Sequence, residues 1–258
     1  MFPRPPIVLT FAASDPTGGA GLQADLLTLA GMGCHPLSVL TAVTVQDTSG
    51  VESVHAVEPE RVRAQAELLL AETRVAAFKI GVLGSAANIH AVSAILEEHP
   101  EVPVVLDPVL ASGRGDPLSD AQMLEAMREQ LVPQSTVVTP NSIEARRLGG
   151  AMRLLEAGCE FVLVTGTHEP GEEVINTLYD RSGVVREDRW PRLAGSYHGS
   201  GCTLASAIAA ALASGLGVPE AVREAQEYTW QTLAAGFRPG AGQLIPDRFF
   251  WAREGARE

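Results

Sequence analysis

The sequence predicts an α/β fold: an open, doubly wound, mostly parallel sheet with helices on both faces and an antiparallel edge hairpin. Short β-rich runs alternate with longer helical patterns along most of the chain, as in successive βαβ units. A glycine-containing turn at residues 180–183 then joins two β-rich runs where a closed barrel would need a helix. No repeat, linker or low-complexity tract divides the 258 residues. We therefore expect residues 1–258 to form one domain.

The parallel strands are expected where short apolar or β-branched runs occur, at residues 7–12, 37–45, 76–80, 104–107, 136–138 and 161–164. Helical periodicity lies between these runs, for example at residues 61–74, 87–98 and 119–131. Because a helical pattern separates most successive strands, the strands are expected to run parallel.

Towards the end of the chain, two β-rich runs follow each other without a helical pattern between them. Residues 174–179 and 184–187 flank the turn at 180–183 and are expected to form the antiparallel hairpin. Helical patterns at residues 201–214 and 219–235 complete the fold. An open sheet with an antiparallel edge accommodates this order, whereas an eight-fold barrel does not.

Composition excludes several classes of protein. The formal net charge of -12 gives no general attraction for nucleic acid or anionic lipid, so we expect neither as a partner. The small-apolar stretch at residues 204–218 is interrupted by serines and glycines, which favours a packed helix over a membrane span. Cys34, Cys159 and Cys202 cannot all pair within one chain and lack C-x-x-C spacing, which favours a reducing cytoplasm. The sequence does not determine the oligomeric state, and a homodimer is the one assembly considered.

Polar or glycine-rich motifs follow the predicted strands one after another. In an open α/β sheet, ligands bind beyond the carboxyl ends of the strands. Turn chemistry explains any one of these motifs but explains the whole series less well. The motifs lie at residues 14–21, 46–48, 81, 107–108, 140–141 and 165–166.

The sequence argues against two common nucleotide-binding loops, the dinucleotide-binding glycine motif and the P-loop. Residues 18–21 supply a turn that opens a helix with free amides, and residues 19–24 match the loose dinucleotide pattern G-x-G-x-x-A. The glycines come late after the strand, and no acidic residue follows about 20 residues later. A dinucleotide-dependent oxidoreductase is therefore a weak alternative. Lys79, the only lysine, stands in no G-x-x-x-x-G-K-[ST] motif, which excludes a P-loop NTPase.

The sharpest single motif is residues 198–203, His-Gly-Ser-Gly-Cys-Thr. The amides of Gly199, Ser200 and Gly201 precede a small-residue helix and are expected to converge on an anion such as a phosphoryl group. Cys202 lies in the first helical turn, where we expect the helix dipole to lower the thiol pKa and make Cys202 a proton acceptor. The alternative is a small apolar side chain packed at a tight helix entry.

Asp107 and Glu144 are acidic residues just beyond neighbouring strands. The spacing from Asn141 to Glu144 puts both side chains on one side of a first helical turn. Two hard oxygen donors suit a magnesium ion that keeps its waters and also holds phosphates. The competing interpretation is a capping box, with Asn141 as the N-cap and Glu144 at the third helical position. The two interpretations are compatible.

Taken together, these motifs resemble the hydroxymethylpyrimidine and phosphomethylpyrimidine kinases of thiamine biosynthesis, within the ribokinase-like superfamily. The resemblance runs along nearly the whole chain. Its most specific parts are residues 13–21, 44–48, 79–83, 107–109, 140–144 and 198–202.

The resemblance implies transfer of the ATP γ-phosphoryl group to 4-amino-5-hydroxymethyl-2-methylpyrimidine, then to its monophosphate. It implies that the Gln46 amide binds the aminopyrimidine edge and that Cys202 stands where related sugar kinases place a catalytic aspartate. The amides from Gly199 to Cys202 would stabilise the moving phosphoryl group, and Asp107 and Glu144 would hold Mg²⁺. Further substrate-binding positions are Asp15, Gly21 and Val109, and nucleotide-binding positions are Asn141, Thr165, Gly166 and Gly199.

Two departures from the family pattern leave alternatives open. Residues 165–168 read Thr-Gly-Thr-His where the family usually has Lys-Gly-Gly-His, so a phosphate-contacting ammonium group is absent. The stretch between Asn141 and Thr165 is also about one helix shorter than usual. A non-catalytic pyrimidine-binding protein is therefore one alternative. A pyridoxal or pyridoxine kinase is another, because its substrate ring also carries a hydroxymethyl group.

Overall fold

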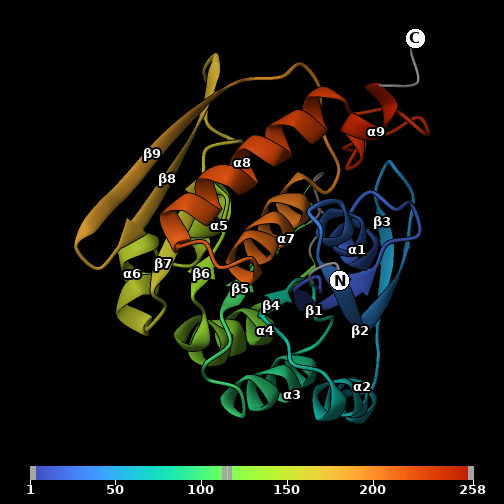
Figure 1. The fold of residues 1–258 in the computed structure, drawn as a ribbon, viewed down its shortest axis with the longest axis vertical. Helices are drawn as coiled ribbons and strands as arrows, with labels where there is room; N and C mark the ends of the chain where they lie inside the picture. The colour runs from blue at the N-terminus through green and yellow to red at the C-terminus, as the bar shows by residue number, and fades with distance from the viewer. Residues whose placement is uncertain (1–3, 112–114, 116–117, 255–258) are drawn as a thin grey trace.

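One nine-stranded sheet runs through the computed structural model, which describes residues 4–111, 115 and 118–254. The strand order is β3-β2-β1-β4-β5-β6-β7-β8-β9 (Figure 1). The mutually parallel strands are β1 (Ile7–Ser14), β2 (His35–Gln46), β4 (Ala77–Ile80), β5 (Val104–Leu106), β6 (Val137–Val138) and β7 (Phe161–Thr165). Strand β8 (Glu173–Asp180) pairs antiparallel with β7 and forms an antiparallel hairpin with β9 (Gly183–Pro191), which confirms the predicted edge.

The opposite edge of the sheet is also antiparallel, which the sequence did not predict. Strand β3 (Val51–Ala56) pairs with the end of β2 across a turn in which the Asp47 carboxylate accepts hydrogen bonds from the amides of Ser49 and Gly50. Most of the β3 side chains are partly or fully exposed. An edge strand with little buried surface carries little apolar alternation, so its sequence shows only a weak strand pattern.

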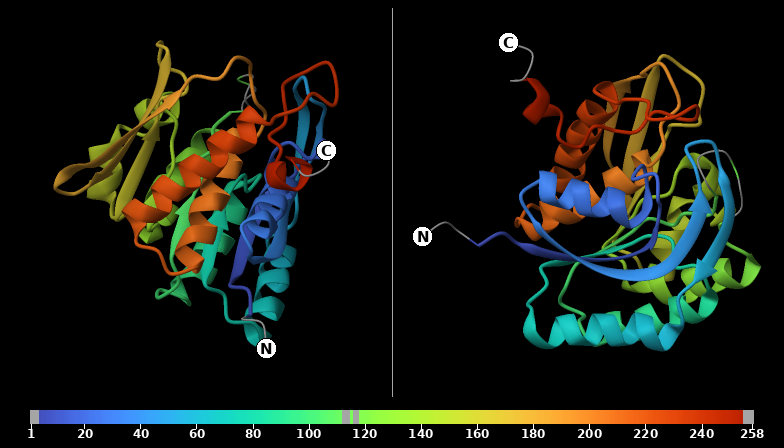
Figure 2. Two further views of the ribbon diagram at one scale, coloured as in Figure 1. Left: turned by 45° about the horizontal axis from the view of Figure 1, so that its top comes forward. Right: turned by 90° about the vertical axis from the view of Figure 1, so that its right-hand side faces the viewer.

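Helices cover both faces of the sheet (Figure 2). On one face lie α1 (Gly21–Gly31), α7 (Ser200–Ala213) and α8 (Val218–Ala234), with a core rich in the alanines of α7. On the other face lie α2 (Pro59–Glu72), α3 (Ala86–Glu97), α4 (Ala121–Ala126) and α6 (Ala151–Ala157), around a core that includes Phe11 and Phe78. The doubly wound fold class is therefore confirmed.

The helix expected at residues 119–131 is shorter than predicted. Helix α4 passes into a π-helical turn at Met127–Leu131 and then a 3₁₀ turn at Val132–Gln134. Pro133 has no N–H and clashes with an α-helical carbonyl one turn earlier, so a regular helix cannot run past it. Two short helices, α5 (Ser142–Arg147) and α6, then lead to β7, and α9 (Phe250–Glu254) ends the described chain.

The parallel strands end at a common edge of the sheet. The chain winds from β1 to β2 on one side and continues through β4 to β7 on the other, so the strand order reverses beside β1. A crevice forms at such a reversal, beyond the carboxyl ends of the strands. Among the described residues, no helix combines the length and the apolar character needed to cross a membrane.

Candidate active site

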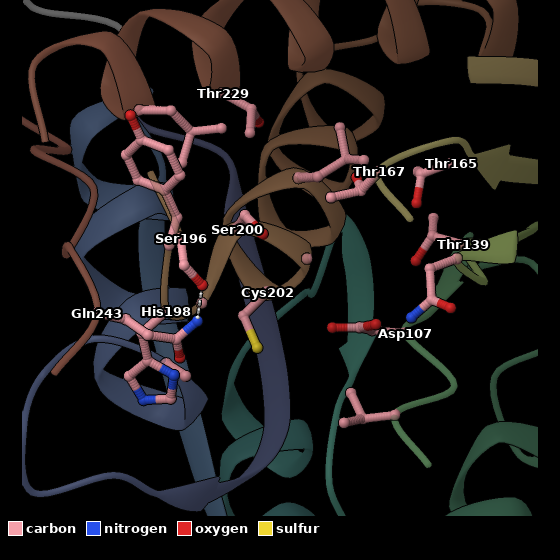
Figure 3. Close-up of a pocket in the computed structure, with 18 of the residues that line it drawn as sticks. Asp107, Thr139, Thr165, Thr167, Ser196, His198, Ser200, Cys202, Thr229 and Gln243 are labelled. Atoms are coloured by element: carbon pink, nitrogen blue, oxygen red, sulfur yellow. Dashed lines mark hydrogen bonds between the residues drawn. The ribbon is translucent and has the colours of Figure 1, made fainter. Parts of the chain in front are cut away.

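A cavity of about 490 Å³ lies at the carboxyl ends of the parallel strands (Figure 3). Its volume falls within the usual range for a small-molecule site. The predicted site residues that line this cavity are Asp15, Gly21, Gln46, Asp107, Val109, Asn141, Glu144, Thr165, Gly199, Ser200, Gly201 and Cys202. Segments far apart in the sequence therefore meet around one space.

The glycine turn at the start of α7 forms one wall of the cavity. Gly199 has a φ of +79°, and a Cβ atom there would lie 1.9 Å from the carbonyl oxygen of Gly19, so only glycine fits. A Cβ atom on Gly201 would lie 3.9 Å from both carboxylate oxygens of Asp107, so this glycine faces that carboxylate. The amides in the first turn of a helix have no intrahelical acceptor and are free to bind an anion.

The ionisation of Cys202 differs from the sequence-based prediction. Figure 3 shows its sulfur on the cavity side of the turn, facing Asp107. Burial raises the pKa of the Cys202 thiol to about 12, and the charges of Asp107 and Asp25 add to this effect while Lys79 opposes it. The expected lowering of the pKa is therefore wrong, because loss of water on burial outweighs the charge of Lys79 and the other effects that lower it. The thiol is protonated near neutral pH, and its role as proton acceptor stays a prediction.

Asp15 organises the loop between β1 and α1. Its carboxylate accepts hydrogen bonds from the amide of Thr17 at 2.8 Å, the amide of Ala20 at 2.7 Å and Nε2 of His198 at 2.8 Å. The Gln46 side chain, at the end of β2, also donates to it. Burial raises the pKa of Asp15, but these hydrogen bonds outweigh burial and hold the pKa well below its usual range. Asp15 is thus ionised and fixes the orientation of Gln46.

Asp107 and Glu144 are two buried carboxylates whose pKa values are both raised. Burial raises the pKa of Asp107 to about 6, with Asp25 adding to the effect and Lys79 opposing it. Burial and the charge of Asp107 raise the pKa of Glu144 to about 7. Oδ2 of Asp107 is buried and has no hydrogen-bond partner among the described residues.

The capping interpretation of Asn141 and Glu144 is confirmed. Oδ1 of Asn141 accepts hydrogen bonds from the amides of Ile143 and Glu144, and Oε2 of Glu144 accepts one from the amide of Asn141 at 2.9 Å. Among the residues that the structure describes, the other oxygen of Glu144 accepts only a 3.3 Å bond from the Leu110 amide. The capping box fixes the carboxylate without using all of its acceptor capacity.

The donor set fits a magnesium ion that keeps most of its waters. Asp107 offers a buried oxygen without a partner, and Glu144 has unused acceptor capacity. No group of three or more His, Cys, Asp or Glu side chains that could hold a metal occurs among the described residues. Waters and phosphate oxygens would therefore complete the coordination, as is usual for Mg²⁺.

Thr165 and Gly166 have different environments at the end of β7. Thr165 lines the cavity, whereas Gly166 does not. A Cβ atom on Gly166 would lie 2.3 Å from the carbonyl oxygen of Ile175, and its amide donates to Oδ1 of Asn176 at 3.1 Å. Gly166 therefore packs against β8, which explains why this position requires glycine without any ligand contact.

Sequence reasoning missed a buried ion pair beneath the site. Nζ of Lys79, on β4, lies 2.8 Å from Oδ1 of Asp25, and both side chains are fully buried. Thr10 and Ser206 also donate to this carboxylate, at 2.6 Å and 2.8 Å. Burial lowers the pKa of Lys79, but Asp25, Cys202 and Asp107 outweigh burial and raise it. The available signal was the only lysine of the chain, placed in a strand that is otherwise apolar.

The other half of the cavity is largely apolar and was also not predicted. The hairpin contributes Val174 and Trp190, and α8 contributes Trp230 and Leu233. The two tryptophan rings lie with their centroids 6.3 Å apart at an interplanar angle of 28°. Flat apolar walls of this kind suit an aromatic ring of a ligand.

A comparison with protein families and relatives agrees with this geometry. Residues 15–247 match the family model described as phosphomethylpyrimidine kinase. A hydroxymethylpyrimidine/phosphomethylpyrimidine kinase of Streptomyces coelicolor is 42% identical, with 96% of each chain covered. The protein of the same name from Escherichia coli is 36% identical, with 88% of this chain and 90% of that protein covered.

Solved structures show the same fold. The ADP complex of Bacillus subtilis pyridoxal kinase has a TM-score of 0.88 at 28% identity, covering 96% of this chain and 99% of that chain. Staphylococcus aureus pyridoxal kinase in complex with AMP-PCP and pyridoxal has a TM-score of 0.87 at 28% identity, covering 97% and 96%. A phosphomethylpyrimidine kinase of Clostridium difficile has a TM-score of 0.77 at 31% identity, covering 88% and 99%.

Proposed function

Because the chain belongs to the phosphomethylpyrimidine kinase family, we propose that it phosphorylates 4-amino-5-hydroxymethyl-2-methylpyrimidine with ATP. The first transfer goes to the hydroxymethyl oxygen, and a second transfer converts the monophosphate to the diphosphate. One observation carries this proposal: the Gly199–Cys202 turn faces Asp107 in a cavity that also holds Asp15 and Gln46. An anion-binding turn, a carboxylate pair and a polar ring-binding wall are what such a transfer needs.

The nucleotide is expected to place its terminal phosphate on the first turn of α7. The free amides from Gly199 to Cys202 donate to its oxygens, and this donation strengthens as negative charge moves during transfer. Asp107 and Glu144 hold Mg²⁺, which supplies neutralising charge to the phosphates when bound. The use of ATP is supported by the related kinase structures that contain ADP or AMP-PCP.

The pyrimidine ring is expected to bind between the Asp15 loop and the end of β2. Gln46 presents its amide to the aminopyrimidine edge, and its hydrogen bond to Asp15 fixes which way the amide points. Cys202 then lies near the hydroxymethyl oxygen, and in its thiolate form it would accept the proton of that hydroxyl group. We place the reaction in the cytoplasm, because Cys34, Cys159 and Cys202 are all free thiols.

Pyridoxal is a second candidate substrate. The S. aureus structure contains pyridoxal and shares the fold of this chain over nearly its whole length. Pyridoxal is also a six-membered aromatic ring with a hydroxymethyl group, so it presents the same reacting atoms.

Release of ADP in the presence of Mg²⁺ tests the proposed function. We expect the pyrimidine alcohol and its monophosphate both to stimulate ADP release, and pyridoxal to compete with lower kcat/KM. Faster turnover of pyridoxal would identify the second candidate as the principal activity. Tight pyrimidine binding without ADP release would identify a binding protein instead.

A further inference from the structure

Arg248 is a buried charged residue that the proposed function does not use. It lies just before α9 and is 2% exposed. In the described part of the chain, its guanidinium donates to uncharged oxygens: Oγ1 of Thr203 at 3.1 Å and the carbonyls of Gly18 at 3.3 Å and Gly19 at 2.5 Å. A buried charge is costly unless hydrogen bonds compensate for lost water. Moving any of these three oxygens away would leave the buried guanidinium with an unpaired N–H group, so Arg248 holds them in place.

The bond to Gly19 reaches Asp15 through one peptide group. In a trans peptide, the C=O and the following N–H point in opposite directions. The Gly19 carbonyl points at Arg248, so the amide of Ala20 points the other way, and it donates to Oδ2 of Asp15 at 2.7 Å. Arg248 thus fixes the plane of the peptide that binds the Asp15 carboxylate.

The neighbouring peptide forms a second connection to the same carboxylate. The Gly18 carbonyl accepts from Arg248, and the Gly19 amide donates to Oγ1 of Thr17 at 3.1 Å. That hydroxyl in turn donates to Oδ2 of Asp15 at 2.9 Å. Both peptides therefore connect Arg248 to Asp15.

The bond to Thr203 connects the same guanidinium to the other side of the site. Oγ1 of Thr203 accepts from Nε of Arg248 and donates to the carbonyl oxygen of Gly199 at 2.8 Å. Gly199 is in direct backbone contact with Gly19, with no room for a Cβ atom between them. One planar cation therefore contacts both the loop of Asp15 and the turn that begins α7.

We propose that Arg248 is a positioning residue that fixes the Asp15 loop relative to the Gly199–Cys202 turn, and so sets the distance between the ring alcohol and the transferred phosphoryl group. The inference rests on the proposed function, since it assigns these two segments to the two reactants. Phosphoryl transfer depends mainly on positioning and electrostatic stabilisation. A misplacement of about 1 Å lowers such a rate by about 10²-fold.

Steady-state kinetics of four variants test the proposal. R248M removes all three bonds, T203V removes the hydroxyl that reaches Gly199, and T203S retains that hydroxyl. The matched control is R253M, because Arg253 is a 65% exposed arginine in the same segment, paired with Asp247. We expect kcat to fall about 10²-fold in R248M and about 10-fold in T203V, with KM for ATP changed less than about 3-fold. T203S and R253M are expected to retain wild-type kcat.

A second readout does not depend on turnover. The amide proton resonance of Ala20, measured by NMR, reports its hydrogen bond to Asp15, and we expect this resonance to shift in R248M but not in R253M. An inactive wild-type protein would refute the proposed function, while the Ala20 resonance would still test the coupling. If R248M does not fold, the comparison of kcat between T203V and T203S tests the proposal instead. Equal kcat in those two variants, or an unchanged Ala20 resonance in folded R248M, overturns the proposal.

Discussion

Replacement of Lys79 by methionine tests the buried ion pair beneath the site. Methionine keeps the length and the apolar stem of the side chain but removes the ammonium group that lies 2.8 Å from Asp25. Asp25 would retain the hydrogen bonds from Thr10 and Ser206, but its charge would lose the ammonium group that is paired with it. Removing one partner of a buried pair costs about 3–5 kcal/mol.

This loss is large relative to the whole stability of a domain, which is about 5–15 kcal/mol. We expect urea denaturation to show a lower free energy of unfolding for K79M, with an unchanged m-value. The double variant K79M/D25N should lose less stability than K79M alone, because asparagine carries no charge that would be left buried without a partner. The matched control R153M breaks the exposed Arg153–Glu156 pair and should change stability by less than about 1 kcal/mol. A loss below about 1 kcal/mol in K79M would refute the reasoning.

The remaining predictions concern single groups of the site. Asp107 and Glu144 have pKa values raised to about 6 and about 7, so the native state binds more protons than the unfolded state. The free energy of unfolding in EDTA should therefore fall as pH rises from about 4 to about 7, and Mg²⁺ should restore it; stability that rises over this range would contradict the assignment. Q46L should raise KM for the pyrimidine about 10²-fold with little change in KM for ATP, since a buried ring polar group would lose its partner; equal effects on both KM values would argue against it. C202A should lower kcat about 10²-fold with pyrimidine affinity retained, and an unchanged kcat would assign the side chain to packing. G199A should unfold at lower temperature by differential scanning calorimetry, because its Cβ would meet the Gly19 carbonyl; an unchanged melting temperature would show that the turn can shift.

The parts of the fold predicted from the sequence are those set by local patterns. Apolar runs and helical periodicity located β1, β2, β4, β5, β6 and β7, and the glycine turn located the β8–β9 hairpin. Because parallel strands end at one edge, the motifs that follow them were expected to meet, and most of them line one cavity.

The rest depends on contacts between distant parts of the chain. His198 and Asp15 are 183 positions apart, and Arg248 and Gly19 are 229 apart, so no local pattern joins them. The thiol pKa of Cys202 depends on the burial that α7 acquires only after packing. Strand β3 was not predicted, because its side chains are partly or fully exposed at the edge of the sheet and its sequence therefore lacks the apolar alternation typical of a strand.

Transfer of the labelled γ-phosphoryl group of ATP tests the central claim most directly. With Mg²⁺ and 4-amino-5-hydroxymethyl-2-methylpyrimidine, the label should appear first in the pyrimidine monophosphate and then in the diphosphate, as followed by mass spectrometry. No label in either product, with the pyrimidine bound and ATP intact or hydrolysed only to free phosphate, would contradict it.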